Sequence, residues 1–272
     1  MASSSYYDTV VSYADLYDTI PMYPLFELSH YILMILAVRQ DFRDGSKHLA
    51  QTNPLVCWFC SMLSSFAGTF MANFLLGQPL LAPFSNHFNI GLATAVWYLI
   101  FYCPGDIFFT IVSSFPAQLV FIPLKEVLRM RKIAGGVAQA AAVYPSSFLV
   151  MLIIGTIKGT GSLQMRNIER LLRGSTGPSS NQLTAPSITM KASIIISLLM
   201  VLQRYAVLSI PLALLQLCCS VVLTAVKLSM LFGMRDPFEP AEGVLRPVLF
   251  GKKPKESAVK KAKENENKNK KE

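Results

Sequence analysis

The sequence predicts an all-α integral membrane protein with seven transmembrane helices and a disordered, basic C-terminal tail. Its 272 residues are 52% hydrophobic and only 15% charged, whereas soluble proteins carry about a quarter charged residues. Seven apolar runs approach the length that a helix needs to cross a bilayer. The first six runs suggest two inverted three-helix repeats followed by a seventh helix. A shared Ser-Ser-Phe triplet, at 64–66 and 146–148, gives these repeats an offset of 82.

The seven predicted spans cover residues 24–38, 55–76, 90–103, 107–124, 133–158, 188–208 and 211–232. The first 20 residues lack the positively charged start of a cleavable signal peptide, so the first span itself must direct insertion. Arg39 opens a loop, 39–53, whose basic residues mark it as cytosolic, and the loop 159–186 has the same basic excess. This orientation places the N-terminus in the lumen and the C-terminus in the cytosol.

The C-terminal tail carries most of the net charge, because residues 251–272 contain nine lysines and four glutamates. Such a segment is expected to be solvated and attracted to anionic lipid, and it is not a nucleic-acid-binding element. Lys268 and Lys270 also fit the dilysine pattern that returns membrane proteins to the endoplasmic reticulum. We therefore predict three regions, listed in chain order as a luminal segment (1–20), a seven-helix transmembrane domain (21–235) and a cytosolic tail (236–272).

The first span contains two ionisable residues, Glu27 and His30, one helical turn apart and so on one face. An acid inside a membrane helix is a candidate functional group that faces the interior of the bundle. Because Glu27 is close to the start of the span, a position at the membrane surface is an equally good interpretation.

The residues needed for enzymatic chemistry are not grouped in this sequence. The five cysteines all belong to apolar runs, and their odd number argues against a disulfide framework. The three histidines are scattered without metal-ligand spacing. No arrangement of His, Asp, Glu or Cys suited to catalysis is apparent, so we predict that the protein is not an enzyme and needs no metal.

The most unusual stretch is a cluster of five charged residues between Lys125 and Lys132. On a helix, Lys125, Arg129 and Lys132 fall within about 60° of each other, whereas Glu126 and Arg131 point elsewhere. The span order places this cluster in a luminal loop between the fourth and fifth spans, against the usual orientation of basic residues. A stripe that faces a water-filled vestibule inside the protein explains this position better.

The fifth predicted span contains features of a bent helix. Gly135 and Gly136 open it, and Gly155 lies near its end. Glycines at membrane depth allow a helix to kink or to approach a neighbour closely, so these three are candidate gating positions. Lys158 ends the span, either as a basic counterpart of the stripe or as a residue that extends to the membrane surface.

The run Lys-Glu-Val-Leu-Arg-Met-Arg-Lys-Ile at 125–133 resembles the Lys-Glu-Val signature of the trimeric intracellular cation channels of the endoplasmic and sarcoplasmic reticulum. The similarity covers most of 20–235, includes the Gly-Thr-Ile-Lys-Gly-Thr-Gly segment at 155–161, and is strongest to B-type members from invertebrates. The resemblance implies a homotrimer in which each subunit encloses its own pore within seven helices. Such channels pass potassium and other monovalent cations and balance charge as calcium leaves the store.

The same resemblance implies specific roles for residues of the stripe. Lys125 and Arg129 correspond to the family's residues that bind phosphatidylinositol 4,5-bisphosphate. The possible pore or gating residues, Lys132, Gly135, Gly136, Gly155 and Lys158, are instead inferred from their charge or flexibility on the predicted helices. A basic stripe without a bound anion would repel cations, whereas a lipid headgroup would shield it. A secondary transporter of a small anion or sugar is the alternative, because inverted repeats and a basic midplane site also occur in transporters.

Overall fold

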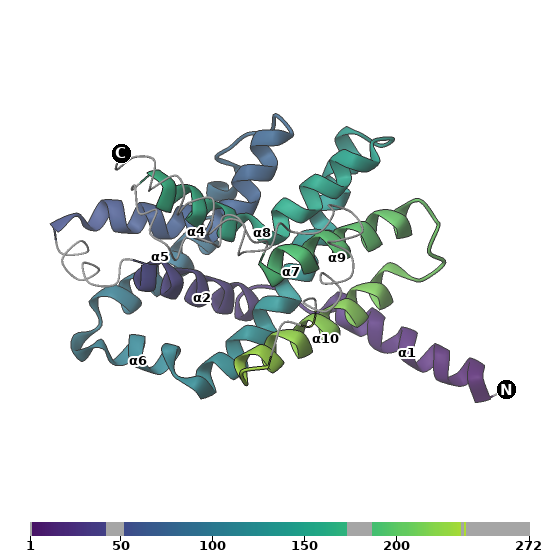
Figure 1. Ribbon diagram of the computed structural model, residues 1–272, viewed down its shortest axis with the longest axis horizontal. Helices are drawn as coiled ribbons and strands as arrows, with labels where there is room; N and C mark the ends of the chain where they lie inside the picture. The colour runs from purple at the N-terminus through teal and green to yellow at the C-terminus, as the bar shows by residue number, and fades with distance from the viewer. Residues whose placement is uncertain (1, 42–51, 173–186, 235–236, 238–272) are drawn as a thin grey trace, which may run out of the picture. The chain divides into compact units, whose positions relative to one another are not determined.

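The computed structural model describes residues 2–41, 52–172, 187–234 and 237. These residues form nine α-helices and no strand, which confirms the all-α prediction for this part of the chain. The helices are α1 (Ala2–Thr19), α2 (Leu25–Asp41), α4 (Pro54–Leu75), α5 (His87–Tyr102), α6 (Ile107–Ser113), α7 (Phe115–Val143), α8 (Phe148–Leu172), α9 (Ile188–Arg204) and α10 (Leu212–Leu231) (Figure 1). The dilysine pattern and most of the two basic loops lie outside the described residues.

Three of these helices, α4, α8 and α10, are long and apolar enough to cross a membrane by themselves. A bent pair passes the same test together, namely α5 with the segment Pro104–Ser113, at an angle of 94°. The 17-residue helices α2 and α9 and the charged helix α7 fall outside this test for reasons of length or composition. Within the compact unit that ends at Leu231, α8 packs against α4, α7 and α9, and α7 packs against α2 and α10.

The predicted boundary between the fourth and fifth spans is wrong. Helix α7 runs for 29 residues through the basic stripe, which therefore lies in mid-helix and not in a luminal loop. The residues of the stripe are mostly strong helix formers, and several of its charges are paired, so nothing forces a break there. The chain turns instead at Tyr144–Ser147, where Pro145 cannot continue the backbone hydrogen-bond pattern.

Three further sequence assignments change with this correction. Gly135 and Gly136 belong to α7, whereas Gly155 belongs to α8, so the glycines lie on two neighbouring helices. Lys158 lies in the middle of α8, which continues to Leu172. The Ser-Ser-Phe triplets at offset 82 are not equivalent, because 64–66 is internal to α4 and 146–148 marks the turn into α8.

The bend between α5 and α6 is held by an arginine that we predicted to start a loop. Arg39 lies in the last turn of α2, and its side chain is only 5% exposed. Its guanidinium donates to the carbonyl of Ile100 in the last turn of α5 and pairs with Asp106 at 3.1 Å, just before α6. It also lies over the ring of Phe109, 4.0 Å from the centroid. Arg39 therefore bridges both sides of the bend and is not a solvated loop residue.

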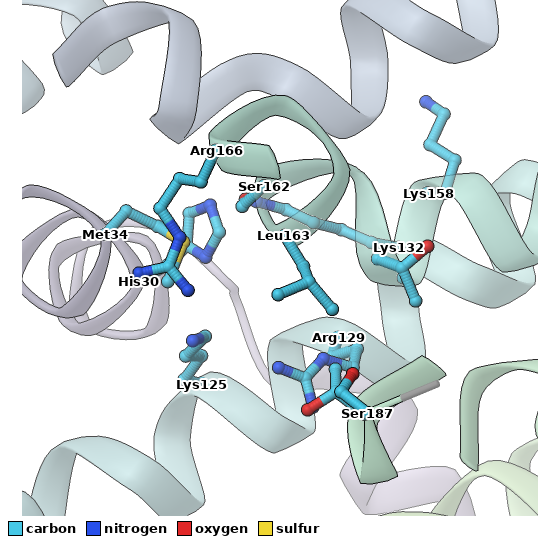
Figure 2. A pocket seen from close by; sticks show the side chains of 13 residues that line it. His30, Met34, Lys125, Arg129, Lys132, Lys158, Ser162, Leu163, Arg166 and Ser187 are labelled. Carbon is cyan, nitrogen blue, oxygen red and sulfur yellow. The ribbon is translucent and has the colours of Figure 1, made fainter. Parts of the chain in front are cut away.

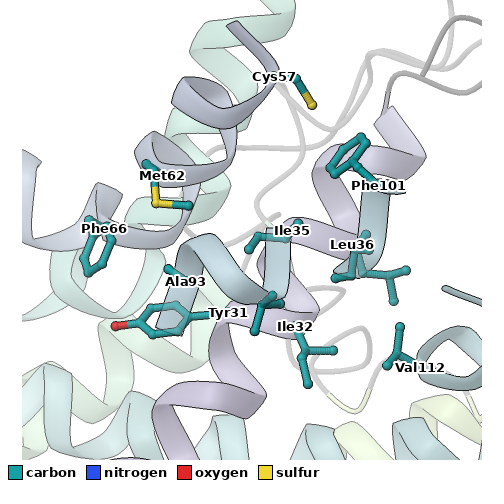
Figure 3. Close-up of a cluster of buried hydrophobic side chains, with 12 residues drawn as sticks. Tyr31, Ile32, Ile35, Leu36, Cys57, Met62, Phe66, Ala93, Phe101 and Val112 are labelled. Atoms are coloured by element: carbon teal, nitrogen blue, oxygen red, sulfur yellow. The ribbon is translucent and has the colours of Figure 1, made fainter. Parts of the chain in front are cut away.

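An apolar core joins α2, α4 and α5 (Figure 3). Tyr31, Ile35, Met62, Val96 and Ile100 are each at most 2% exposed in this core. This core holds α2 in place, and α2 in turn contacts α7 along the face that carries the basic stripe.

The N-terminal helix α1 packs on α10 and is also tied to α7. Arg131 donates to the carboxylate of Asp18 and, at 2.6 Å, to the carbonyl of Tyr17. Its guanidinium lies 4.8 Å from the centroid of the Tyr17 ring. Arg131 thus points away from the rest of the stripe, as its helical position predicted.

Candidate functional site

A cavity of about 130 Å³ lies between α2, α7, α8 and the start of α9 (Figure 2). Helices α7 and α8 contribute all of its cationic side chains. The charged lining residues are Lys125, Arg129, Lys132, Lys158 and Arg166, and the others are His30, Met34, Gly159, Thr160, Ser162, Leu163, Ser187 and Thr189. The predicted phosphoinositide-binding pair and two of the predicted pore residues therefore come together at one site.

Helix α7 contributes the three cations that the helical periodicity placed on one face. Lys125, Arg129 and Lys132 all line the cavity, which confirms the predicted stripe. Arg129 forms an ion pair with Glu126, and both side chains are at most 8% exposed. Lys132 lies 3.4 Å from the carboxylate of Glu27. Of the two interpretations of Glu27, the structure supports the one in which it faces the interior.

Helix α8 contributes a second polar stripe that the sequence analysis missed. Lys158, Ser162 and Arg166 follow one another at intervals of four residues, so they share a face of the helix. Arg166 lies 3.7 Å from the carboxylate of Asp41 at the end of α2. The four-residue spacing was visible in the sequence, but it carried no meaning while the helix was expected to end at Lys158.

The start of α9 forms part of the cavity wall. Its lining side chains, Ser187 and Thr189, are uncharged, but its backbone contributes a positive electrostatic potential. Ser187 caps this helix, because its hydroxyl accepts a hydrogen bond from the Met190 backbone N–H. The N-terminal end of a helix carries a partial positive charge, which favours anions nearby. At the same edge, Lys227 of α10 donates to the Thr189 hydroxyl at 2.7 Å.

Among the described residues, the cations around the cavity outnumber the carboxylates that pair with them. Five cationic residues line it, and the ion pairs found in this part of the chain involve Glu27, Asp41 and Glu126. Within the described residues, Lys125 and Lys158 have no carboxylate within salt-bridge distance. A polar cavity with this excess of positive charge is suited to an anionic group, such as a phosphate, that accepts charge-assisted hydrogen bonds.

His30 lines the cavity and links two helices. Its Nε2 lies 2.9 Å from the carbonyl oxygen of Ser65, to which it can donate a hydrogen bond. This contact joins α2 to α4 behind the cationic side chains. His30 was noted in the sequence only for sharing a face with Glu27.

Of the three glycine candidates, Gly136 and Gly155 pack closely against other residues and Gly135 does not. A Cβ atom at Gly136 would lie 2.7 Å from Lys158 Cγ and 3.2 Å from Gly155 Cα, so α7 and α8 cross here in direct contact. A Cβ atom at Gly135 would have no neighbour within 4 Å. A similar crossing joins α4 and α8, where Gly161 meets the backbone of Gly68.

Comparison with known proteins gives a consistent result. The family model described as "TRIC channel" matches residues 43–233. The chain is 40% identical over 232 residues to trimeric intracellular cation channel type 1B.1 of Caenorhabditis elegans, covering 85% of this chain and 79% of that protein. It is 38% identical over 242 residues to the human type A channel, covering 86% and 79%.

Solved structures with the same arrangement of helices are also similar in sequence. A trimeric intracellular cation channel from C. elegans, solved in the absence of Ca2+, superposes with a TM-score of 0.77 at 38% identity, covering 83% of this chain and 97% of that one. A structure described as the structural basis for activity of TRIC counter-ion channels in calcium release gives 0.75 at 31% identity, covering 82% and 98%.

Proposed function

Because the chain belongs to the family of trimeric intracellular cation channels, we propose that it is a channel for potassium and other monovalent cations. It would act in the membrane of the endoplasmic or sarcoplasmic reticulum and supply counter-ion current during calcium release. It would assemble as a homotrimer with a pore inside each subunit. The observation that carries this proposal is the cavity itself, which brings ionisable groups from the middle of α7 together with groups from α2 and α8.

The positive charge of this cavity needs an explanation in a cation channel. We propose that the headgroup of phosphatidylinositol 4,5-bisphosphate binds to Lys125 and Arg129 and neutralises part of the excess. Lys125 supports this assignment because it has no carboxylate within salt-bridge distance among the described residues. The guanidinium of Arg129 has five donors, so its pairing with Glu126 leaves donors for a phosphate.

The pore and gating roles fall to the contact between α7 and α8. Lys132 and Lys158 flank the crossing at which Gly136 and Gly155 meet. A change in this crossing would move both lysines relative to each other, which is a suitable basis for gating. Gly135 has no such contact and would contribute only backbone flexibility.

The packing supports a seven-span arrangement with two inverted repeats. Under this proposal the spans are α2, α4, α5, α7, α8, α9 and α10, with a luminal N-terminus and a cytosolic tail after residue 235. The equivalent helices α2 and α7 contact each other, as do α4 and α8. Gly68 and Gly161 meet at the second contact, and their offset of 93 maps α4 onto 147–168, close to the observed α8.

Single-channel recording from purified protein in planar bilayers tests the function. In a gradient of potassium chloride, discrete current steps with a reversal potential near that of potassium would support the proposal. Steps that reverse near the chloride potential would refute cation selectivity. Saturable flux into vesicles without current steps would instead favour transport of a small anion or sugar.

A further inference from the structure

A cluster of three neutral amide side chains joins the end of α4, the loop after it and the C-terminal part of α7. Gln139 Nε2 donates to Asn73 Oδ1 at 2.9 Å and to Gln78 Oε1 at 2.5 Å. None of these residues lines the basic cavity. Two amide oxygens therefore converge on the single point that the Gln139 nitrogen occupies.

The fold fixes the direction of these oxygens. Asn73 is only 3% exposed, and its Nδ2 donates to the carbonyl of Pro79 at 3.0 Å, so its Oδ1 must face Gln139. The Gln78 N–H donates to the Asn73 carbonyl at 2.8 Å across a turn in which Gly77 has a φ of +64°. The turn thus fixes the backbone of Gln78 next to Asn73, and the Gln78 side chain is placed by its contact with Gln139.

Gln139 lies on the same face of α7 as the cavity. It follows Lys132 by seven residues and Gly136 by three, which places the three side chains on one stripe, with Gln139 about 10 Å along the axis from Lys132. Along α7, the close contact of Gly136 with α8 lies between Lys132 and Gln139. The loop that supplies Gln78 has no charged residue between Gly77 and Phe88.

The chemistry of the cluster differs from that of the cavity. Neutral carbonyl oxygens replace the hydration shell of potassium in ion channels. The –NH2 group of Gln139 carries a partial positive charge and holds the position that such a cation would take. Rotating this amide by half a turn would bring three amide oxygens together, an arrangement that repels itself unless a cation lies between them. The amide group and a cation are therefore alternative occupants of one position.

We propose that Asn73, Gln78 and Gln139 form a coordination site for a monovalent cation, about 10 Å along α7 from Lys132. The site is closed when the Gln139 nitrogen bonds to the other two amides and open when its oxygen turns inward with a cation. This proposal rests on the channel function proposed above. It assigns cation preference to neutral oxygens at a distance from the lysines and arginines, which cannot provide it.

The test uses full-length purified protein in planar bilayers, with Gln139→Leu and the isosteric Gln139→Glu as variants. Gln203→Ala is the control, because that amide is at the end of α9 and donates only to the Ile210 carbonyl. We expect Gln139→Leu to change the potassium-to-sodium permeability ratio by about fivefold, the effect of losing one polar contact. Gln139→Glu should raise the cation-to-anion ratio. Ratios equal to those of the wild type in both variants would overturn the site and leave the channel function standing.

A second measurement does not need conduction. The unfolding temperature of the wild type is compared in potassium chloride and in N-methylglucamine chloride of equal concentration. We expect potassium to stabilise the wild type and the Gln203→Ala control but not Gln139→Leu. If the wild type passes no current, the channel proposal fails, and this comparison still decides the site. Equal effects of potassium on the wild type and Gln139→Leu would refute it.

Discussion

Replacing Arg39 by methionine should destabilise the protein markedly. Methionine keeps the apolar contact with Phe109 but leaves the carboxylate of Asp106 without its arginine and the Ile100 carbonyl without this donor. Breaking one side of a fully buried ion pair costs about 3–5 kcal/mol. Because the Asp106 side chain is 27% exposed, we expect a smaller loss of about 2–3 kcal/mol.

This loss is measurable as a shift of the unfolding temperature. For a protein of this size, 2–3 kcal/mol corresponds to a decrease of about 5–10 °C, which can be followed in detergent by intrinsic fluorescence. The double variant Arg39→Met, Asp106→Asn removes both charges, and asparagine tolerates the left-handed backbone of residue 106, where φ is +56°. We expect the double variant to recover about 1–2 kcal/mol relative to Arg39→Met.

The matched control is Arg204→Met, because Arg204 also lies in the last turn of a helix but is exposed. Its unfolding temperature should stay within about 1 °C of the wild type. An Arg39→Met variant as stable as this control would refute the role of Arg39 in the bend. A double variant less stable than Arg39→Met alone would show that the pair is not coupled as described.

Two further predictions concern the cavity and the helix crossing. The double variant Lys125→Ala, Arg129→Ala should weaken binding to phosphoinositide vesicles by well over tenfold, since each charge-assisted contact contributes about 1.5–3 kcal/mol. The control Arg131→Ala, on another face of the helix, should bind these vesicles as the wild type does. Equal binding by all variants in a flotation assay would contradict the lipid assignment. Gly136→Leu should change open probability because its side chain meets Lys158 and Gly155, while Gly135→Leu extends into open space; single-channel records in which both variants behave alike would remove Gly136 from gating.

The sequence was sufficient for the parts of the site that depend on one helix. Lys125, Arg129 and Lys132 share a face because helical periodicity alone determines it, and the structure brings all three to one cavity. The boundary between the fourth and fifth spans was harder to place, because the charged residues from Lys125 to Lys132 resemble the end of a span when their partners are unknown. Glu27 explains the error, because its carboxylate comes from a helix about a hundred residues earlier and allows Lys132 to be buried in mid-helix.

Contacts between residues far apart in the sequence could not be predicted either, because they depend on how the helices pack. Arg39 reads as a loop residue when only its charge is considered, and its partners, Ile100 and Asp106, are known only once α2 and α5 lie side by side. The glycine contacts show the same limit. Gly135 and Gly136 are adjacent in sequence, yet only the position of α8 distinguishes the one that is in contact.

The two anchors of α7 restrict which motions this helix can make. Arg131 is bound to Asp18 at the end of α1, and Lys132 is bound to Glu27 at the start of α2. Successive side chains of a helix project about 100° apart, so turning α7 about its own axis would pull on both ion pairs at once. A field or ligand that moved the cations of α7 would therefore also displace the junction between the first two helices.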